Sequence, residues 1–272
     1  MKIPSKIYTF LILLFLYAPI IVMVIFSFNS SNSTGLFAGF SFKWYSVLIG
    51  EKNIMQALYN TLVLAVSSAL ISTVIGTAAA VGIDKWKKNL LRSSVMGVTN
   101  IPMMNPEIVT GVSMMLLFVF MGRLIGKQEI LGFETILIAH VTFNLPYVIL
   151  SVLPKLRQTD SFLAEAAQDL GCTPIMAFFK AVLPSITSGI VTGMIMAFTL
   201  SLDDFIISYF TTGPGFQTLP IAIFSMTKKR VKPDMYALST LIFISILVLL
   251  ILTNVAQVRG ETKKNKTAKG DA

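Results

Sequence analysis

The sequence predicts an all-α integral membrane protein with six transmembrane helices and both termini in the cytoplasm. Three observations lead to this fold class. Hydrophobic residues make up 54% of the 272 residues and charged residues only 13%, which is about half the charged share of a soluble domain. The apolar residues gather in stretches of about 20, the length that a helix needs to cross a bilayer. Lysines and arginines flank most of these stretches, as they do where they set membrane topology.

Six apolar stretches can each form a spanning helix. The first follows Lys2 and Lys6 and shows no evident cleavage site, so we interpret it as a retained signal anchor. The third is interrupted by "IPMMNPE", where Asn105 is expected to cap a new helix with Pro106 at its first position. The expected spans are Ile7–Phe28, a segment within Ala57–Ile83, Glu107–Met121, Thr135–Leu153 with a bend near Pro146, Ile186–Leu202 or its extension to Phe210, and Tyr236–Val258.

The distribution of basic residues predicts the orientation. Six spans place both ends on one side, and with the termini inside, only eight of the 22 lysines and arginines lie outside. The positive-inside rule therefore favours cytoplasmic termini. Residues 1–258 are expected to form the membrane domain, and residues 259–272 a polar cytoplasmic tail. The outside basic residues are Lys43, Lys52, Arg123, Lys127, Lys228, Lys229, Arg230 and Lys232, the last four within the run "KKRVK".

The residue inventory argues against several classes of function. Cys172 and His140 are each the only residue of their type, which leaves no thiol metal site and little basis for histidine catalysis. The phosphate-binding pattern G-x-x-x-x-G-K-[ST] is absent, so this chain does not bind ATP in that way. The net charge of +9 comes from residues beside the spans and indicates topology instead of a nucleic-acid partner. We expect no enzyme activity, no metal and no cofactor in this chain.

Two adjacent aspartates, Asp203 and Asp204, lie in the apolar run "TLSLDDFIISYF". A carboxylate is costly in hydrocarbon, so an acid there usually has a function. Either one aspartate lines a substrate path while the other caps the next turn or lines a helix interface, or the pair marks the outer interface with Asp204 capping a following helix. Glu107 either faces the same path or complements the N-terminus of its helix. His140 and Asn144 are expected to make interhelical hydrogen bonds and not to bind a ligand.

A patterned polar loop, "EAAQDLGCTPIMAFFKAVLP", lies between the fourth and fifth spans, within residues 154–185 or so. Gly171 is expected to end a first short helix, because helices commonly close on a left-handed glycine. Thr173 and Pro174 are expected to start a second helix as its cap and first residue. The sequence therefore predicts two short helices joined at a glycine on the cytoplasmic face.

This loop resembles the EAA loop of ABC-transporter permease subunits. The family pattern is Glu-Ala-Ala, three residues, Gly, nine residues, then Ile-x-Leu-Pro, and Ala181 departs from it where Ile is favoured. The resemblance implies the type I ABC importer permease (MetI-like) fold. It also implies that the loop docks on a separate ATP-hydrolysing subunit and transmits its motion to the spans. The matching residues are Glu165, Ala166, Ala167, Gly171, Leu183 and Pro184.

The same resemblance assigns roles within the loop. Glu165 would contact the ATPase surface, and Gly171 would set the angle between the two helices. The apolar side chains of Phe178, Phe179 and Leu183 would anchor the loop to its own spans.

Further segments are similar to the inner permease subunit of spermidine/putrescine importers (PotC type). They include "YAPIIVMVIFSFNSS", "WYSVL", "NTLVLA", "LSLDDFIISYFTTGP" and "IFSMTKKRVKP", and together cover nearly the whole chain. This resemblance implies a polyamine path across the bacterial cytoplasmic membrane. Asp203, Asp204 and Glu107 would supply negative charge to the path, and Phe205 and Tyr209 would add cation–π contacts.

The resemblance also implies a set of partners. They are a homologous permease subunit, two ATP-binding subunits that carry ATP and Mg²⁺, an extracytoplasmic polyamine-binding protein and membrane lipid. One alternative keeps this assembly but changes the cargo to another small organic cation or solute. The other is a self-sufficient secondary transporter, which would show inverted repeats and broken helices in both halves.

Overall fold

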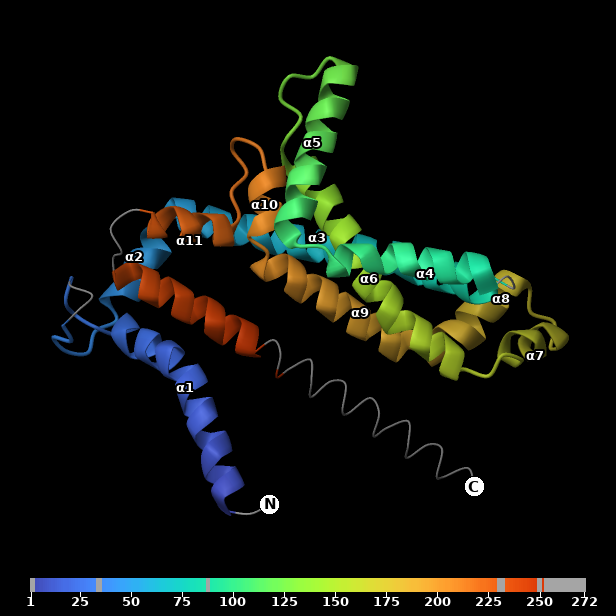
Figure 1. The fold of residues 1–272 in the computed structure, drawn as a ribbon, viewed down its shortest axis with the longest axis horizontal. Coiled ribbons are helices and arrows are strands. Elements are labelled where there is room, and N and C mark those ends of the chain that lie inside the picture. Colours follow the sequence, from blue (N-terminus) through green and yellow to red (C-terminus); the bar gives the residue numbers. More distant parts are fainter. Residues whose placement is uncertain (1–2, 33–35, 87–88, 229–232, 249–250, 252–272) are drawn as a thin grey trace. The chain divides into compact units, whose positions relative to one another are not determined.

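The computed structural model describes residues 3–32, 36–86, 89–228, 233–248 and 251 (Figure 1). Within these ranges the regular elements are helices, apart from one backbone bridge between Asn29 and Phe40. Five of the described helices are long and apolar enough to cross a membrane, and a shorter apolar helix covers Pro233–Val248. The all-helical membrane fold is therefore confirmed with five candidate spans. Residues 249, 250 and 252–258 of the sixth stretch, the tail 259–272 and residues 229–232 lie outside the described residues.

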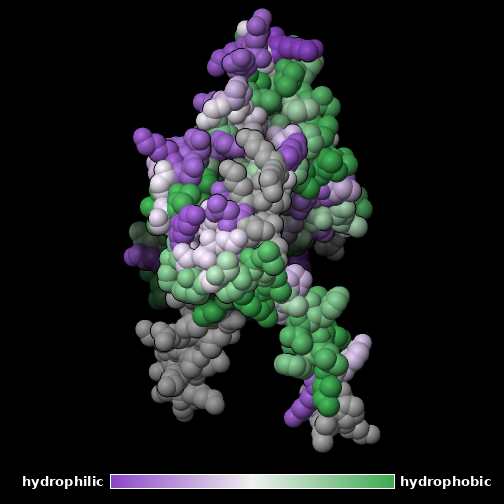
Figure 2. All heavy atoms as spheres, turned by 90° about the vertical axis from the view of Figure 1, so that its left-hand side faces the viewer, coloured by the Kyte–Doolittle hydropathy of each residue, from purple (hydrophilic) through white to green (hydrophobic). Residues whose placement is uncertain are grey.

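The chain divides into two compact units, of which the first contains residues 1–57 and 222–252. Its elements include α1 (Ile3–Ser27), α2 (Lys43–Gly50) and the helix Pro233–Val248. The most apolar part of α1 has none of its residues buried within the protein. Figure 2 shows its hydrophobic side chains exposed along much of the helix at the lower right. A helix that is apolar all round suits a lipid environment, because its own backbone groups are hydrogen-bonded internally.

Asn29 fixes the segment that joins α1 to α2. Its buried side chain donates from Nδ2 to the Leu36 carbonyl (2.7 Å) and accepts at Oδ1 from the Ala38 backbone N–H (2.9 Å). Its own carbonyl accepts from the indole Nε1–H of Trp44 (2.7 Å). The turn after the first span is thus held by side-chain hydrogen bonds to the backbone, which replace a regular ladder.

The second unit contains residues 58–221 and 253–272. Its core lies along α6 and α9, which pack side by side (Figure 1). Glycines allow the close approach: a Cβ on Gly189 would lie 2.8 Å from the Ser151 carbonyl, and one on Gly193 would lie 3.1 Å from the Val148 Cα. Small residues at such interfaces let membrane helices pack backbone against backbone. Its elements are most of α3 (Lys52–Lys85), α4 (Asn89–Met104), α5 (Glu107–Ile125), α6 (Phe133–Gln158), α7 (Leu163–Asp169), α8 (Pro174–Ala177), the π-helical turn η1 (Phe178–Val182), α9 (Leu183–Asp203), α10 (Ile206–Thr211) and the start of α11 (Leu219–Thr227).

The predicted break in the third stretch is confirmed, but its capping is not. Helix α4 ends at Met104 and α5 begins at Glu107. Pro106, with ψ at 131°, occupies the N-cap position outside the helix, and its carbonyl accepts from the Val109 N–H (2.9 Å). The span therefore starts at Glu107 as predicted, but Pro106 occupies the N-cap position and not the first helical position. The Asn105 side chain does not cap it and donates to the Thr110 hydroxyl instead (3.3 Å).

The fifth span begins earlier than predicted and ends at Asp203, one residue after the predicted end at Leu202. Helical geometry runs without interruption from Pro174 to Asp203, so the span includes the second short helix of the loop. The extension to Phe210 was wrong, because Asp204 turns out of the helix with ψ at 125° and a separate helix, α10, begins at Ile206.

Candidate functional site

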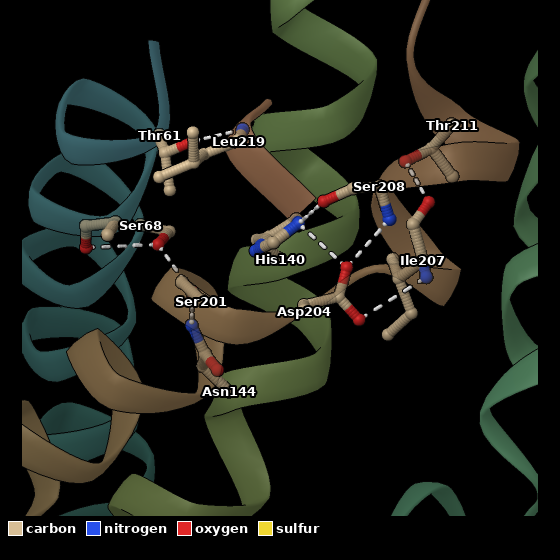
Figure 3. A network of polar contacts seen from close by, with 11 residues as sticks. Thr61, Ser68, His140, Asn144, Ser201, Asp204, Ile207, Ser208, Thr211 and Leu219 are labelled. Carbon is tan, nitrogen blue, oxygen red and sulfur yellow. Dashed lines mark hydrogen bonds and ion pairs between the residues drawn. The ribbon is translucent and has the colours of Figure 1, made fainter. Parts of the chain in front are cut away.

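The two adjacent aspartates have opposite environments at the junction between α9 and α10. Asp203 is the last residue of α9, and it is exposed. Asp204 lies outside the helix, and only 4% of its side chain is exposed. Its carboxylate accepts from the backbone N–H of Ser208 at Oδ2 (2.7 Å) and of Ile207 at Oδ1 (3.3 Å) (Figure 3). The structure thus shows Asp204 capping the following helix, a role that the substrate-path and the interface interpretations both allowed.

His140 contacts this cap from α6 (Figure 3). Its Nε2 lies 2.9 Å from the Ser208 hydroxyl and 3.4 Å from Asp204 Oδ2, and the residue is 1% exposed. The predicted interhelical hydrogen bond of His140 is therefore confirmed. A buried carboxylate needs such partners, because removing its charge from water is otherwise very costly.

A second polar contact joins three helices one turn before the aspartates. The Ser201 hydroxyl of α9 accepts from the Asn144 amide of α6 (2.8 Å) and from the Ser68 hydroxyl of α3 (2.8 Å), as Figure 3 shows. All three residues are buried. The interhelical role predicted for Asn144 is confirmed, and the end of α9 is fixed to both of its neighbours.

Glu107, predicted from sequence as a second acid, lies near Asp203. It is exposed in the first turn of α5, and its carboxylate is close enough to repel that of Asp203. The same carboxylate also interacts with the phenol of Tyr147 on α6. Glu107 of α5 thus interacts with Asp203 of α9 and with Tyr147 of α6, and a cation near the two acids would be attracted by both carboxylates.

Tyr147 was not predicted from the sequence as a site residue. His140, Asn144 and Tyr147 stand at positions i, i+4 and i+7, so they share one face of α6. That face carries polar atoms through an otherwise apolar span, and its periodicity was the signal available in the sequence.

The aromatic residues that follow the aspartates pack on one another. The rings of Phe205 and Tyr209 lie with their centroids 5.4 Å apart, and Tyr209 is 45% exposed. Their place beside the α9–α10 junction fits the predicted cation–π role, which stays a prediction.

The loop between α6 and α9 has the local structure that its sequence predicted. Helix α7 ends in two backbone hydrogen bonds, from the Gly171 N–H to the Gln168 carbonyl (2.8 Å) and from the Cys172 N–H to the Ala167 carbonyl (3.1 Å). Gly171 has φ at +89°, so this is a glycine-closed helix end. Thr173 caps α8 by accepting from the Met176 N–H (3.3 Å).

The loop exposes both its charged and its apolar side chains. Glu165 and Ala166 are exposed and Ala167 is half-buried, while Leu183 packs against the core of α6 and α9. The anchoring role expected for Phe179 was wrong, because this side chain is 60% exposed. It belongs instead to a set of outward apolar side chains, the apolar loop surface, which consists of Phe162, Leu170, Ile175, Met176 and Phe179.

Residues 72–263 match the family described as "binding-protein-dependent transport system inner membrane component". The chain belongs to this family. The permease is thus a multi-pass component of the bacterial inner membrane, and this membership argues against the secondary-transporter alternative. This membership also confirms the resemblance drawn from the EAA loop. It identifies the chain as a permease subunit, which is distinct from the ATP-hydrolysing subunit.

Several relatives match the permease over most of their length. It is 38% identical over 251 residues, covering 92% of both chains, to the spermidine/putrescine transport system permease protein PotC of Escherichia coli (strain K12). It is 40% identical over 228 residues, covering 84% of this chain and 81% of its relative, to the putrescine transport system permease protein PotI of the same strain. The PotC protein of Haemophilus influenzae is 34% identical over 258 residues, covering 95% and 96% of the two chains.

Two solved structures support the fold. A bacterial ABC transporter involved in alginate import matches with a TM-score of 0.73 at 17% identity, covering 94% of this chain and 93% of that chain. The MetNI methionine ABC transporter matches with a TM-score of 0.59 at 17% identity, covering 80% and 98%. The predicted ABC importer permease fold is therefore confirmed.

Proposed function

We propose that this permease forms part of a polyamine path in an ATP-driven importer. The observation that carries the proposal is the electrostatic interaction between the carboxylates of Asp203 and Glu107, which lie on two different spanning helices. The like charges repel each other when the path is empty, and a cation with two or more ammonium groups would relieve that repulsion. One ammonium at 4 Å from a carboxylate gains roughly 4 kcal/mol at an effective dielectric constant of 20. The names of the relatives point to the same cargo.

Within this proposal the residues have distinct roles. Asp203, Glu107 and the Tyr147 hydroxyl receive the ammonium groups, and Phe205 and Tyr209 add cation–π contacts. Asp204 contributes through the geometry of the α9–α10 junction and does not touch the cargo, since its carboxylate already accepts two backbone hydrogen bonds.

The proposed assembly contains a homologous permease subunit, two ATP-binding subunits that hold ATP and Mg²⁺, and an extracytoplasmic polyamine-binding protein. The cytoplasmic loop would dock on an ATP-binding subunit through Glu165 and the apolar loop surface. Exposed apolar side chains grouped on so short a segment are typical of a protein interface.

We further propose six spans with cytoplasmic termini. The described part of the last helix, Pro233–Val248, is about 24 Å long at 1.5 Å per residue, which is short of the roughly 30 Å of a bilayer core. The sequence remains mostly apolar to Val258, and this continuation would complete the span. The distribution of lysine and arginine supports the orientation.

The test is uptake of labelled spermidine by vesicles that contain the permease with all its partner subunits. Asp203→Asn and Glu107→Gln should each lower uptake about tenfold or more, corresponding to a lost interaction of about 1.4 kcal/mol. ATPase activity and the amount of assembled complex should persist. Glu129→Gln, which neutralises another exposed acid, is the matched control and should leave uptake unchanged. Parental uptake by both Asp203→Asn and Glu107→Gln would refute the proposed path, and competition by unlabelled putrescine or another organic cation would define the cargo.

A further inference from the structure

We propose that His140 is a positioning residue for transport. It acts through Asp204 and Ser208 to fix the break between α9 and α10, and this break leaves Asp203 as the aspartate that meets the cargo. The inference rests on the proposed function for the cargo, whereas the contacts that carry it are independent of that function.

The break itself creates the need for a cap. The first N–H groups of a helix have no partner within that helix, and in the absence of water each unsatisfied group costs several kcal/mol. The Asp204 carboxylate accepts from two of these groups on α10, at Ile207 and Ser208. The backbone of Asp204 is extended, with ψ at 125°, so the residue that caps α10 is also the residue at which α9 ends.

The buried carboxylate of the cap has a partner on a span that is distant in sequence. Asp204 is buried, and its neighbour Asp203 repels it. His140 approaches from α6, 68 residues away from Ser208 in sequence, and its Nε2 reaches both the Ser208 hydroxyl and the carboxylate of Asp204. Removing a hydrogen-bond partner from a buried carboxylate is destabilising, because the group is then left unsatisfied away from water. His140 therefore determines that Asp204 is the aspartate that is buried.

Loss of the contact between His140 and the cap would change the orientation of Asp203 indirectly. If the junction became a continuous helix, the side chains of Asp203 and Asp204 would point about 100° apart on one cylinder, and either could turn inward. Cargo binding would then weaken because Asp203 no longer keeps one orientation. His140 lies 18 residues before the end of α6 at Gln158, about 27 Å along the helix axis, so the cytoplasmic loop should be unaffected.

The test uses the complete complex in vesicles and measures the KM and maximal rate of spermidine uptake together with ATPase activity. His140→Phe retains a ring but removes Nε2, whereas His140→Gln places an amide group, which can donate and accept, near the position of Nε2. We expect the KM to rise about tenfold in His140→Phe and to stay within about threefold of the parent in His140→Gln. Thr142→Val is the matched control, since its exposed hydroxyl bonds only within α6.

A double-mutant cycle with Asp204→Asn separates positioning from a general packing effect. The loss caused by His140→Phe should shrink in the Asp204→Asn background, because no buried charge then needs compensation. A parental KM in His140→Phe, an equal loss in His140→Gln, or independent effects in the cycle would overturn the inference. If His140→Phe alone does not assemble, the double variant must assemble, and its failure would overturn the inference as well.

The same measurements distinguish the two proposals. If Asp203→Asn lowers uptake but His140→Phe does not, only the positioning role of His140 is wrong. If Asp203→Asn leaves uptake at the parental level, the proposed path and the role of His140 within it both fail.

Discussion

Gly171 offers a sharp test of the coupling loop, because the structure isolates a purely conformational cost there. Its φ is +89°, and a Cβ added to it would meet no other atom within 4 Å. The substitution Gly171→Ala therefore introduces no steric overlap with neighbouring residues. It only forces an L-residue into the left-handed region, which costs roughly 1–2 kcal/mol.

This cost translates directly into docking affinity. A penalty of one to two kcal/mol lowers the population of the observed loop conformation by a factor of about 5–30. The apparent affinity for the ATP-binding subunit should fall by the same factor if only this conformation docks. Asparagine tolerates the left-handed region better than alanine, so Gly171→Asn should lose less than Gly171→Ala.

The assay is binding of the purified ATP-binding subunit to the permease in detergent or nanodiscs. Gly97→Ala is the matched control, since Gly97 lies on an exposed face of α4 with no atom within 4 Å of an added Cβ. The control should bind like the parent. Equal affinity of Gly171→Ala and the parent would show that the glycine-closed loop is not the docking conformation.

Three further predictions concern packing and the loop surface. Gly189→Ala should destabilise the permease by about 1–3 kcal/mol, because the new Cβ meets the Ser151 carbonyl at 2.8 Å. Gly82→Ala, where an added Cβ has open space, is the control and should not destabilise it. Thermal unfolding in detergent compares the two variants, and equal melting temperatures would contradict the close α6–α9 packing. Trp44→Phe should cost about 1–3 kcal/mol in the same assay by leaving the Asn29 carbonyl without its indole donor, and an unchanged melting temperature would count against that bond. Leu170→Ser, at a residue 87% exposed, should leave stability within about 0.5 kcal/mol but weaken binding of the ATP-binding subunit; undiminished binding would remove Leu170 from the interface.

The sequence alone was sufficient for features that depend on neighbouring residues. Apolar stretches of sufficient length predicted the spans, and the proline in "IPMMNPE" predicted the break between α4 and α5. Gly171 and Thr173 predicted the end of α7 and the start of α8, because helix caps are decided within a few residues. The EAA pattern identified the family for the same reason, since its residues form one continuous segment.

Only the tertiary structure decided which of two adjacent acids is buried. The sequence of this apolar run does not distinguish Asp203 from Asp204. In the structure, a histidine from another span contacts Asp204, which is buried as a cap, and Asp203 is exposed. The electrostatic interactions of Glu107 with Asp203 and Tyr147 likewise depend on the positions of helices that are far apart in sequence. Burial and charge compensation are set by groups far apart in sequence, and a pattern of neighbouring residues contains no information about which distant partner will arrive.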